Sequence, residues 1–168
     1  GTFAMFSFYP TKNMTSGEGG MVSASGPDVV RALRLLRNQG MLAQYANEVI
    51  GFNARMTDVH AAIGRVQLRK LAGWTEQRKR NAEFLSANLS GVGVPQIVDG
   101  ATHVFHQYTI RIEGGTAVRD QFAAALREEF QVGCGVYYPT PCHRLQSLQH
   151  FELRVDLPAT EQAAGSSK

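Results

Sequence analysis

Residues 6–22 read FSFYPTKNMTSGEGGMV and place one lysine, Lys12, between an aromatic-rich segment and a glycine-rich turn. The preceding residues 2–8, TFAMFSF, alternate apolar with small side chains, which predicts a buried strand. Pro10 ends that strand, and residues 20–25, GMVSAS, predict a second one. The sequence therefore predicts a strand, a tight loop and a strand around the lysine.

A lysine in this setting has more than one chemical interpretation. Its amine is a nucleophile only when desolvation or a nearby positive charge favours the neutral form. The neighbouring glycines and hydroxyls would let backbone and side chains approach an anion such as a phosphate. A P-loop needs its lysine after the glycines, whereas Lys12 precedes them, so that motif fails. Two interpretations stay open: a pyridoxal phosphate (PLP) site with a Schiff-base lysine, and a surface lysine in a glycine-rich turn.

Composition sets broad limits on the function. The chain of 168 residues has a net charge of +3, spread along its length, which does not favour a nucleic-acid partner. No apolar run is long enough for a membrane span, and no signal peptide is evident, which predicts a cytoplasmic location without a membrane partner. Cys134 and Cys142 lack the spacing of a zinc site and are predicted to be reduced thiols, so no metal is expected.

The rest of the chain predicts alternating helices and strands, hence an α/β fold. A helix is expected to begin at Pro27 and to end at Gly40. A polar and aromatic loop follows at residues 41–56. Thr57 is the expected N-cap of a long helix at residues 58–89, which we expect to link two domains. Further on, the pattern predicts strands at 93–98, 105–112 and 132–138, a helix at 116–130 and another from Pro158.

Four motifs give the chain a family resemblance. FSFYPTKNMTSGEGGMV is followed in order by RLLRNQGM, GFNARMTDVHAAIGRVQL and YYPTPCH. Together they resemble the DegT/StrS family of aminotransferases, which act on nucleotide-linked keto sugars. The resemblance implies the C-terminal portion of an aspartate-aminotransferase-like (type I) PLP fold. It implies a remnant of the large cofactor-binding domain at residues 1–56, an interdomain helix at 57–90 and a small α/β domain, incomplete, at 91–168.

The resemblance also implies the cofactor and its contacts. Lys12 matches the lysine that holds PLP and then carries the proton during amine transfer. Ser7 matches a hydroxyl that contacts the cofactor phosphate. Asn53 matches an asparagine that reaches the phosphate in the neighbouring subunit, which implies a homodimer with shared active sites. Family members that dehydrate their sugar carry histidine in place of the lysine, so Lys12 favours transamination with glutamate or a similar donor.

Five further residues are candidates for contact with the substrate. Tyr9 stands where many relatives have histidine, and Arg55 could meet an anionic donor, the sugar nucleotide or a carboxylate in a plain salt bridge. His106 begins a pattern that resembles the HxY of relatives. Tyr138 and His143 belong to YYPTPCH, which resembles a loop at the substrate entrance, with packing as the alternative for the tyrosine.

One element of a complete PLP site is expected before the first residue of this sequence. In relatives an aspartate faces the pyridine nitrogen and sustains the electron sink, and it lies upstream of the lysine. We therefore expect this chain to represent the C-terminal half of an aminotransferase, completed in the same chain or by a separate N-terminal half. The alternative is a catalytically inactive fragment or assembly module that does not bind PLP productively alone.

Overall fold

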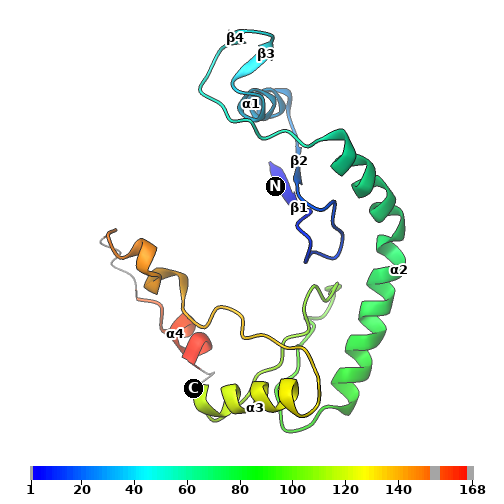
Figure 1. Ribbon diagram of the computed structural model, residues 1–168, viewed down its shortest axis with the longest axis vertical. Helices are drawn as coiled ribbons and strands as arrows, with labels where there is room; N and C mark the ends of the chain where they lie inside the picture. The colour runs from blue at the N-terminus through cyan, green and yellow to red at the C-terminus, as the bar shows by residue number, and fades with distance from the viewer. Residues whose placement is uncertain (1, 152–155, 166–168) are drawn as a thin grey trace. The chain divides into compact units, whose positions relative to one another are not determined.

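The computed structural model describes residues 2–151 and 156–165. They form two compact units, one of residues 1–80 and 104–106 and the other of residues 81–103 and 107–168 (Figure 1). Helices and short antiparallel strands make up the regular structure, which confirms a mixed α/β fold. The division into domains at residues 57 and 91 stays a prediction.

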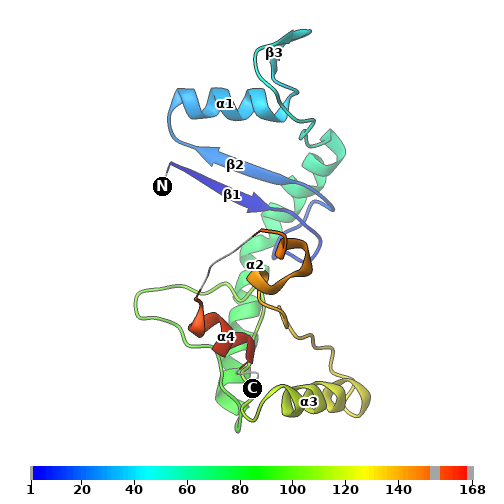
Figure 2. The same cartoon turned by 90° about the vertical axis from the view of Figure 1, so that its left-hand side faces the viewer.

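The first unit begins with the predicted strand–loop–strand (Figure 2). Strand β1, Phe3–Ser7, pairs antiparallel with β2, Gly20–Ala24, from Phe3 opposite Ala24 to Ser7 opposite Gly20. Gly20 suits this pairing because a Cβ there would lie 2.8 Å from the Phe6 carbonyl oxygen. The expected burial of β1 is wrong: all five of its residues are exposed. Burial of a strand requires a second layer, and within the described residues the sheet has two strands only.

Helix α1, Pro27–Arg37, begins with proline at its first turn as predicted. Leu35 is buried on its inner side, 3% exposed. The chain then reverses at Gly40, where φ is +78°. Residues 41–56 were expected to form an irregular loop, but they include a small hairpin, in which β3, Met41–Ala43, pairs with β4, Ala46–Asn47. Periodicity cannot reveal strands of two or three residues, because they are shorter than one repeat of the pattern.

The long helix α2 spans Asp58–Asn88, close to the predicted bounds. The Thr57 hydroxyl accepts a hydrogen bond from the His60 amide at 3.2 Å, so the predicted N-cap is confirmed. Its 31 residues correspond to a length of about 46 Å. Lys79 pairs with Glu76 at 2.8 Å, one turn apart on this helix. No described helix, this one included, is both long and apolar enough to cross a bilayer.

Gly73 offers a stability test for α2. Nothing lies within 4 Å of a Cβ built at this position. Alanine is favoured over glycine inside helices by about 0.8–1.0 kcal/mol. We therefore expect Gly73→Ala to raise the free energy of unfolding by about 0.5–1 kcal/mol, measured by urea denaturation followed by circular dichroism. A lower stability in this variant would mean that another molecule or subunit packs against the glycine.

In the second unit, helix α3 spans Thr116–Glu128 and contributes the buried Ala123. The strands expected at 93–98, 105–112 and 132–138 are wrong for the described residues, where a single antiparallel bridge joins Gly93 to Arg111. A strand needs a neighbouring backbone along its length, and here the pairing ends after two hydrogen bonds of 2.9 and 2.8 Å. The helix expected from Pro158 is confirmed as α4, Pro158–Gly165.

Candidate functional site

Lys12 lies at the end of a β-turn that follows β1. Its backbone N–H donates to the Tyr9 carbonyl at 3.0 Å, with Pro10 at the second position, where proline is favoured. The Phe8 amide donates to the Gly19 carbonyl at 2.9 Å and closes the base of the loop. The lysine side chain is half-buried. The loop is therefore fixed by its own backbone, and it holds Lys12 at a defined position.

Two loop hydroxyls are used to hold the loop itself. Thr15 Oγ1 donates to the Phe8 carbonyl at 2.8 Å and accepts from the Gly17 amide at 2.9 Å. Ser16 is fully buried, and its Oγ donates to the Glu18 carbonyl at 2.7 Å. Neither hydroxyl is therefore available to contact an anion, although the sequence suggested that hydroxyls near Lys12 could do so.

Ser7 differs from these two residues. Its Oγ accepts a hydrogen bond from the Tyr9 amide at 3.4 Å. A serine hydroxyl has one proton to donate in addition to its acceptor lone pairs, so Ser7 keeps a donor for a ligand. Ser7 and Tyr9 are both exposed, at the rim of the turn that holds Lys12.

The glycine turn packs against the start of α2. At Gly19, where φ is +131°, a Cβ would lie 2.4 Å from the Met56 Cε. At Gly17, where φ is +88°, it would lie 3.6 Å from the His60 ring. Both glycines therefore permit a positive φ, and Gly19 also leaves room for the end of the Met56 side chain.

A segment far away in the sequence completes the surroundings of Lys12. Residues 104–106 belong to the same compact unit as the lysine loop, although they are distant from it in the sequence. Asn13 Nδ2 donates to the Val104 carbonyl at 3.0 Å, and Asn13 Oδ1 lies 3.2 Å from His106 Nδ1. Arg78 of α2 donates to the His106 carbonyl at 3.3 Å. The structure thus brings His106 beside the predicted Schiff-base lysine.

These contacts define the protonation of the His106 ring. Because the Asn13 amide nitrogen donates to Val104, its oxygen faces His106 and can only accept. With the amide in this orientation, the contact is a hydrogen bond when His106 Nδ1 carries the proton, and the neutral ring then has its lone pair on Nε2. Sequence reasoning missed Asn13, because an asparagine directly after a lysine has no distinguishing spacing.

The pKa of His106 is lowered from 6.5, first by burial of the ring and then by the positive charges of Lys12 and Arg78. The unfolded chain binds more protons than the native one between the lowered and the ordinary pKa, so acidification through this range destabilises the fold. We expect the NMR titration of His106 to have its midpoint below 6.5. In Lys12→Met the midpoint should rise only part of the way, because burial is the larger cause. An unchanged midpoint in that variant would place the lysine ammonium away from His106, and Lys70→Met serves as the control.

Asn53 and Arg55 lie together at the end of α1. Asn53 pairs with Asn38 in an isolated bridge. Its Oδ1 accepts a hydrogen bond from Arg55 Nε at 3.1 Å, which leaves the Asn53 amide nitrogen as a donor. Within the described residues Arg55 has no carboxylate partner, so the plain salt bridge considered for it stays a prediction.

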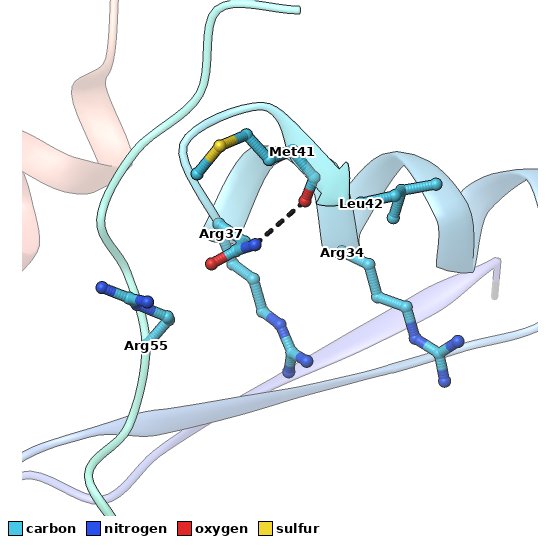
Figure 3. Close-up of a pocket in the computed structure, with 6 residues that line it drawn as sticks. Arg34, Arg37, Met41, Leu42 and Arg55 are labelled. Atoms are coloured by element: carbon cyan, nitrogen blue, oxygen red, sulfur yellow. Dashed lines mark hydrogen bonds between the residues drawn. The ribbon is translucent and has the colours of Figure 1, made fainter. Parts of the chain in front are cut away.

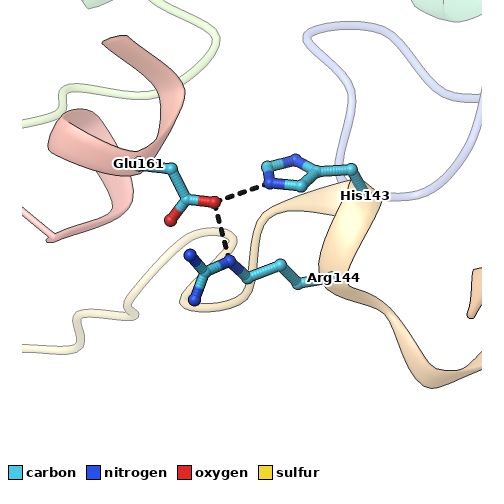
Figure 4. A network of polar contacts seen from close by, with 3 residues as sticks. All are labelled: His143, Arg144 and Glu161. Carbon is cyan, nitrogen blue, oxygen red and sulfur yellow. Dashed lines mark hydrogen bonds and ion pairs between the residues drawn. The ribbon is translucent and has the colours of Figure 1, made fainter. Parts of the chain in front are cut away.

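Tyr138 and His143 belong to the second unit. Tyr138 is 75% exposed and has its ring centroid 6.2 Å from that of Tyr137. His143 Nε2 and Arg144 Nε both lie 2.6 Å from Glu161 Oε1, which ties Cys142–Arg144 to α4 (Figure 4). The hydrogen bond from His143, followed by that from Arg144, holds the pKa of Glu161 below its ordinary value. His143 thus joins Cys142–Arg144 to α4, and its contact with the substrate stays a prediction.

Residues 1–167 match the DegT/DnrJ/EryC1/StrS aminotransferase family. The chain belongs to this family. It is 39% identical over 173 residues to the pleiotropic regulatory protein of Geobacillus stearothermophilus, covering 98% of this chain and 45% of that protein. It is 34% identical over 167 residues to the UDP-N-acetyl-3-dehydro-alpha-D-glucosamine 3-aminotransferase of Acidithiobacillus ferrooxidans, covering 98% and 44%.

The fold agrees with that of a solved DegT/DnrJ/EryC1/StrS family member. The crystal structure of DesV from S. venezuelae aligns with a TM-score of 0.86 and 32% identity, over 99% of this chain and 47% of DesV. The chain therefore spans less than half the length of the relatives it matches. The family consists of PLP-dependent sugar aminotransferases, and the predicted resemblance is confirmed.

Proposed function

We propose that this chain contributes the lysine-bearing half of a PLP-dependent aminotransferase, which moves an amine from glutamate or a similar donor to a nucleotide-linked keto sugar. The observation that carries the proposal is the placement of Lys12 beside His106 in a loop fixed by its own hydrogen bonds. Membership of the family supports the reaction class. Relatives with activity in their names act on sugar nucleotides, as in the Acidithiobacillus enzyme.

Three residues have groups that fit PLP. Lys12 supplies the amine for the aldehyde, and the hydroxyl of Ser7 retains a proton for the phosphate. The Asn53 amide nitrogen is a second phosphate donor, which we assign to the site of a partner subunit in a homodimer. PLP, when bound, supplies the electron sink for breaking the bond between the substrate carbon and its proton.

The side chains of this chain then have separate tasks. Lys12 carries the proton between the substrate carbon and the cofactor carbon. Neutral His106 has Nε2 as an acceptor, which is proposed to take a hydrogen bond from a sugar hydroxyl. Tyr9, Arg55 and Tyr138 are proposed to contact the substrate. For His143, its hydrogen bond to Glu161 supports attachment of α4 in place of substrate contact.

Transamination by the full-length protein tests this proposal. The protein is incubated with PLP and glutamate, and 2-oxoglutarate and pyridoxamine phosphate are quantified by chromatography. Stoichiometric formation of both products is expected. If the glutamate concentration stayed unchanged while PLP was bound, this result would contradict transamination. The protein would then share only its fold with the family.

A non-catalytic role as an assembly module is the second candidate. It is favoured by the exposed apolar side chains of the β1–β2 sheet, such as Met5 at 76% and Phe3 at 56%, because monomeric proteins rarely expose contiguous apolar surface. Titration of this chain alone with PLP discriminates between the two. A Lys12-dependent adduct with turnover of glutamate contradicts the assembly role, whereas a stable oligomer that binds no PLP supports it.

A further inference from the structure

The segment Val104–His106 is held by two side chains of the first unit. Asn13 Nδ2 donates to the first carbonyl of the segment at 3.0 Å. Arg78 of α2 donates from one guanidinium nitrogen to the next two carbonyls, at 3.1 and 3.3 Å. Three successive backbone carbonyls therefore accept a hydrogen bond from a side chain. The position of this segment beside the lysine loop depends on these two residues.

The backbone between these contacts is strained at Phe105. Its φ is +42°, in the left-handed region that bulky residues rarely adopt. The residue is buried, 7% exposed. A sparsely populated backbone conformation persists only where the surrounding structure holds it. Burial of Phe105 and the hydrogen bonds on either side of it therefore fix the residue that follows, His106.

Asn13 also contacts the His106 ring. Its Oδ1 lies 3.2 Å from Nδ1 of the ring. Because Nδ2 of the same amide donates to the Val104 carbonyl, the oxygen is turned toward the ring, and an amide oxygen can only accept. In the part of the chain that the structure describes, His106 Nε2 makes no hydrogen bond. One asparagine, adjacent to Lys12 in the sequence, thus binds both the backbone before the histidine and the histidine itself.

We propose that Asn13 is a positioning residue, which holds neutral His106 with its proton on Nδ1 and thereby makes Nε2 an acceptor for a hydroxyl of the sugar. Which nitrogen of a histidine carries the proton is set by the hydrogen bond of the other one. An accepting Nε2 favours a hydroxyl over a keto oxygen, because the keto oxygen has no proton to donate. The identity of the ligand as a sugar rests on the proposed function.

Nitrogen NMR of the full-length protein with isotope-labelled histidine tests the form of the ring. His106→Gln identifies the resonances, which are recorded above the titration midpoint. The wild type should carry the proton on Nδ1, and Asn13→Ala should transfer it largely to Nε2. Asn13→Asp keeps an acceptor for Nδ1 and should retain the wild-type form. Asn88→Ala is the matched control, because Asn88 Nδ2 also donates to a backbone carbonyl, that of Phe84, at 2.7 Å.

Arg78→Gln distinguishes the ring contact from the backbone contacts. This variant should lower the share of the Nδ1-protonated form by less than Asn13→Ala does, because the asparagine still reaches the ring. A larger effect of Arg78→Gln would assign the positioning to the arginine and overturn the proposal. Arg34→Gln is its control and should leave the ring unchanged, since Arg34 extends from α1 into the wall of a different cavity, of about 470 Å³ (Figure 3).

Calorimetric titration with UDP-glucose and with UDP tests the contact to the sugar. Loss of one hydrogen bond should weaken UDP-glucose binding about three- to tenfold in Asn13→Ala. UDP lacks the sugar, so its affinity should change by less than about twofold. The proposal is overturned by a wild type that carries the proton on Nε2, by one that does not bind UDP-glucose, or by equal UDP-glucose affinities in wild type and Asn13→Ala.

Two further results complete the test. If Asn13→Ala unfolds, the titration midpoint of His106 in Asn13→Asp should rise, because a neighbouring carboxylate favours the charged ring. An unchanged midpoint would overturn the contact between the two side chains. Transamination of glutamate needs no sugar and tests the proposed function separately. Transamination with an unaltered UDP-glucose affinity in Asn13→Ala would refute the role of Asn13 alone, whereas an Asn13-dependent ring without transamination would refute the reaction alone.

Discussion

Lys12→Ala is expected to abolish covalent attachment of PLP and to stop transamination by the full-length protein. The lysine is proposed both to hold the cofactor and to carry the proton, and proton transfer alone is worth about 10²–10⁴-fold in rate. Borohydride reduction in the presence of PLP, followed by peptide mass spectrometry, should locate the adduct on Lys12 in the wild type and find none in the variant. Production of 2-oxoglutarate from glutamate gives the rate.

The matched control is Lys70→Ala, since Lys70 lies on α2 with its Nζ 6.0 Å from the Trp74 ring centroid. This variant should retain both the adduct and the rate. An adduct of equal yield in Lys12→Ala, or one located on another lysine of the wild type, would remove Lys12 from its proposed role. If Lys12→Ala lost activity but still formed an adduct, the lysine would be required for proton transfer and not for attachment of the cofactor.

Gly40→Ala is expected to unfold the turn between α1 and the β3–β4 hairpin. A Cβ at this position would lie 1.7 Å from the Val49 carbonyl oxygen, which belongs to the backbone and cannot rotate away. The left-handed backbone at φ +78° adds a penalty of about 1–2 kcal/mol for alanine. The total loss of stability should therefore exceed about 2 kcal/mol. Amide hydrogen exchange at Glu48, which donates to the Gly40 carbonyl at 2.8 Å, reports this loss locally.

Gly26→Ala separates the backbone penalty at positive φ from the steric clash with the Val49 carbonyl. Gly26 also has positive φ, +96°, but nothing lies within 4 Å of a Cβ built there. Its substitution should cost only the backbone term, about 1–3 kcal/mol for this sparsely populated conformation. If both variants lose the same stability, the close approach of Gly40 to Val49 is not maintained in solution.

Local features of the chain were largely predictable from sequence. The proline at the start of α1 and the Thr57 cap of α2 act on backbone groups within one turn, so short motifs reveal them. The strands expected at 105–112 and 132–138 failed because pairing depends on distant backbone. The HxY resemblance identified His106 as a candidate, but its hydrogen bond to Asn13 joins residues 93 apart in sequence.

By itself the sequence determined the family, the lysine in its glycine-rich loop and the bounds of the main helices, because these depend on neighbouring residues and on collinear motifs. Tertiary structure decided which side chains share the surroundings of Lys12. It assigned Thr15 and Ser16 to the loop itself, left Ser7 without an acceptor for its proton among the described residues, and joined Ala54 to Arg37. These outcomes depend on hydrogen-bond partners that only the folded backbone brings within about 3 Å.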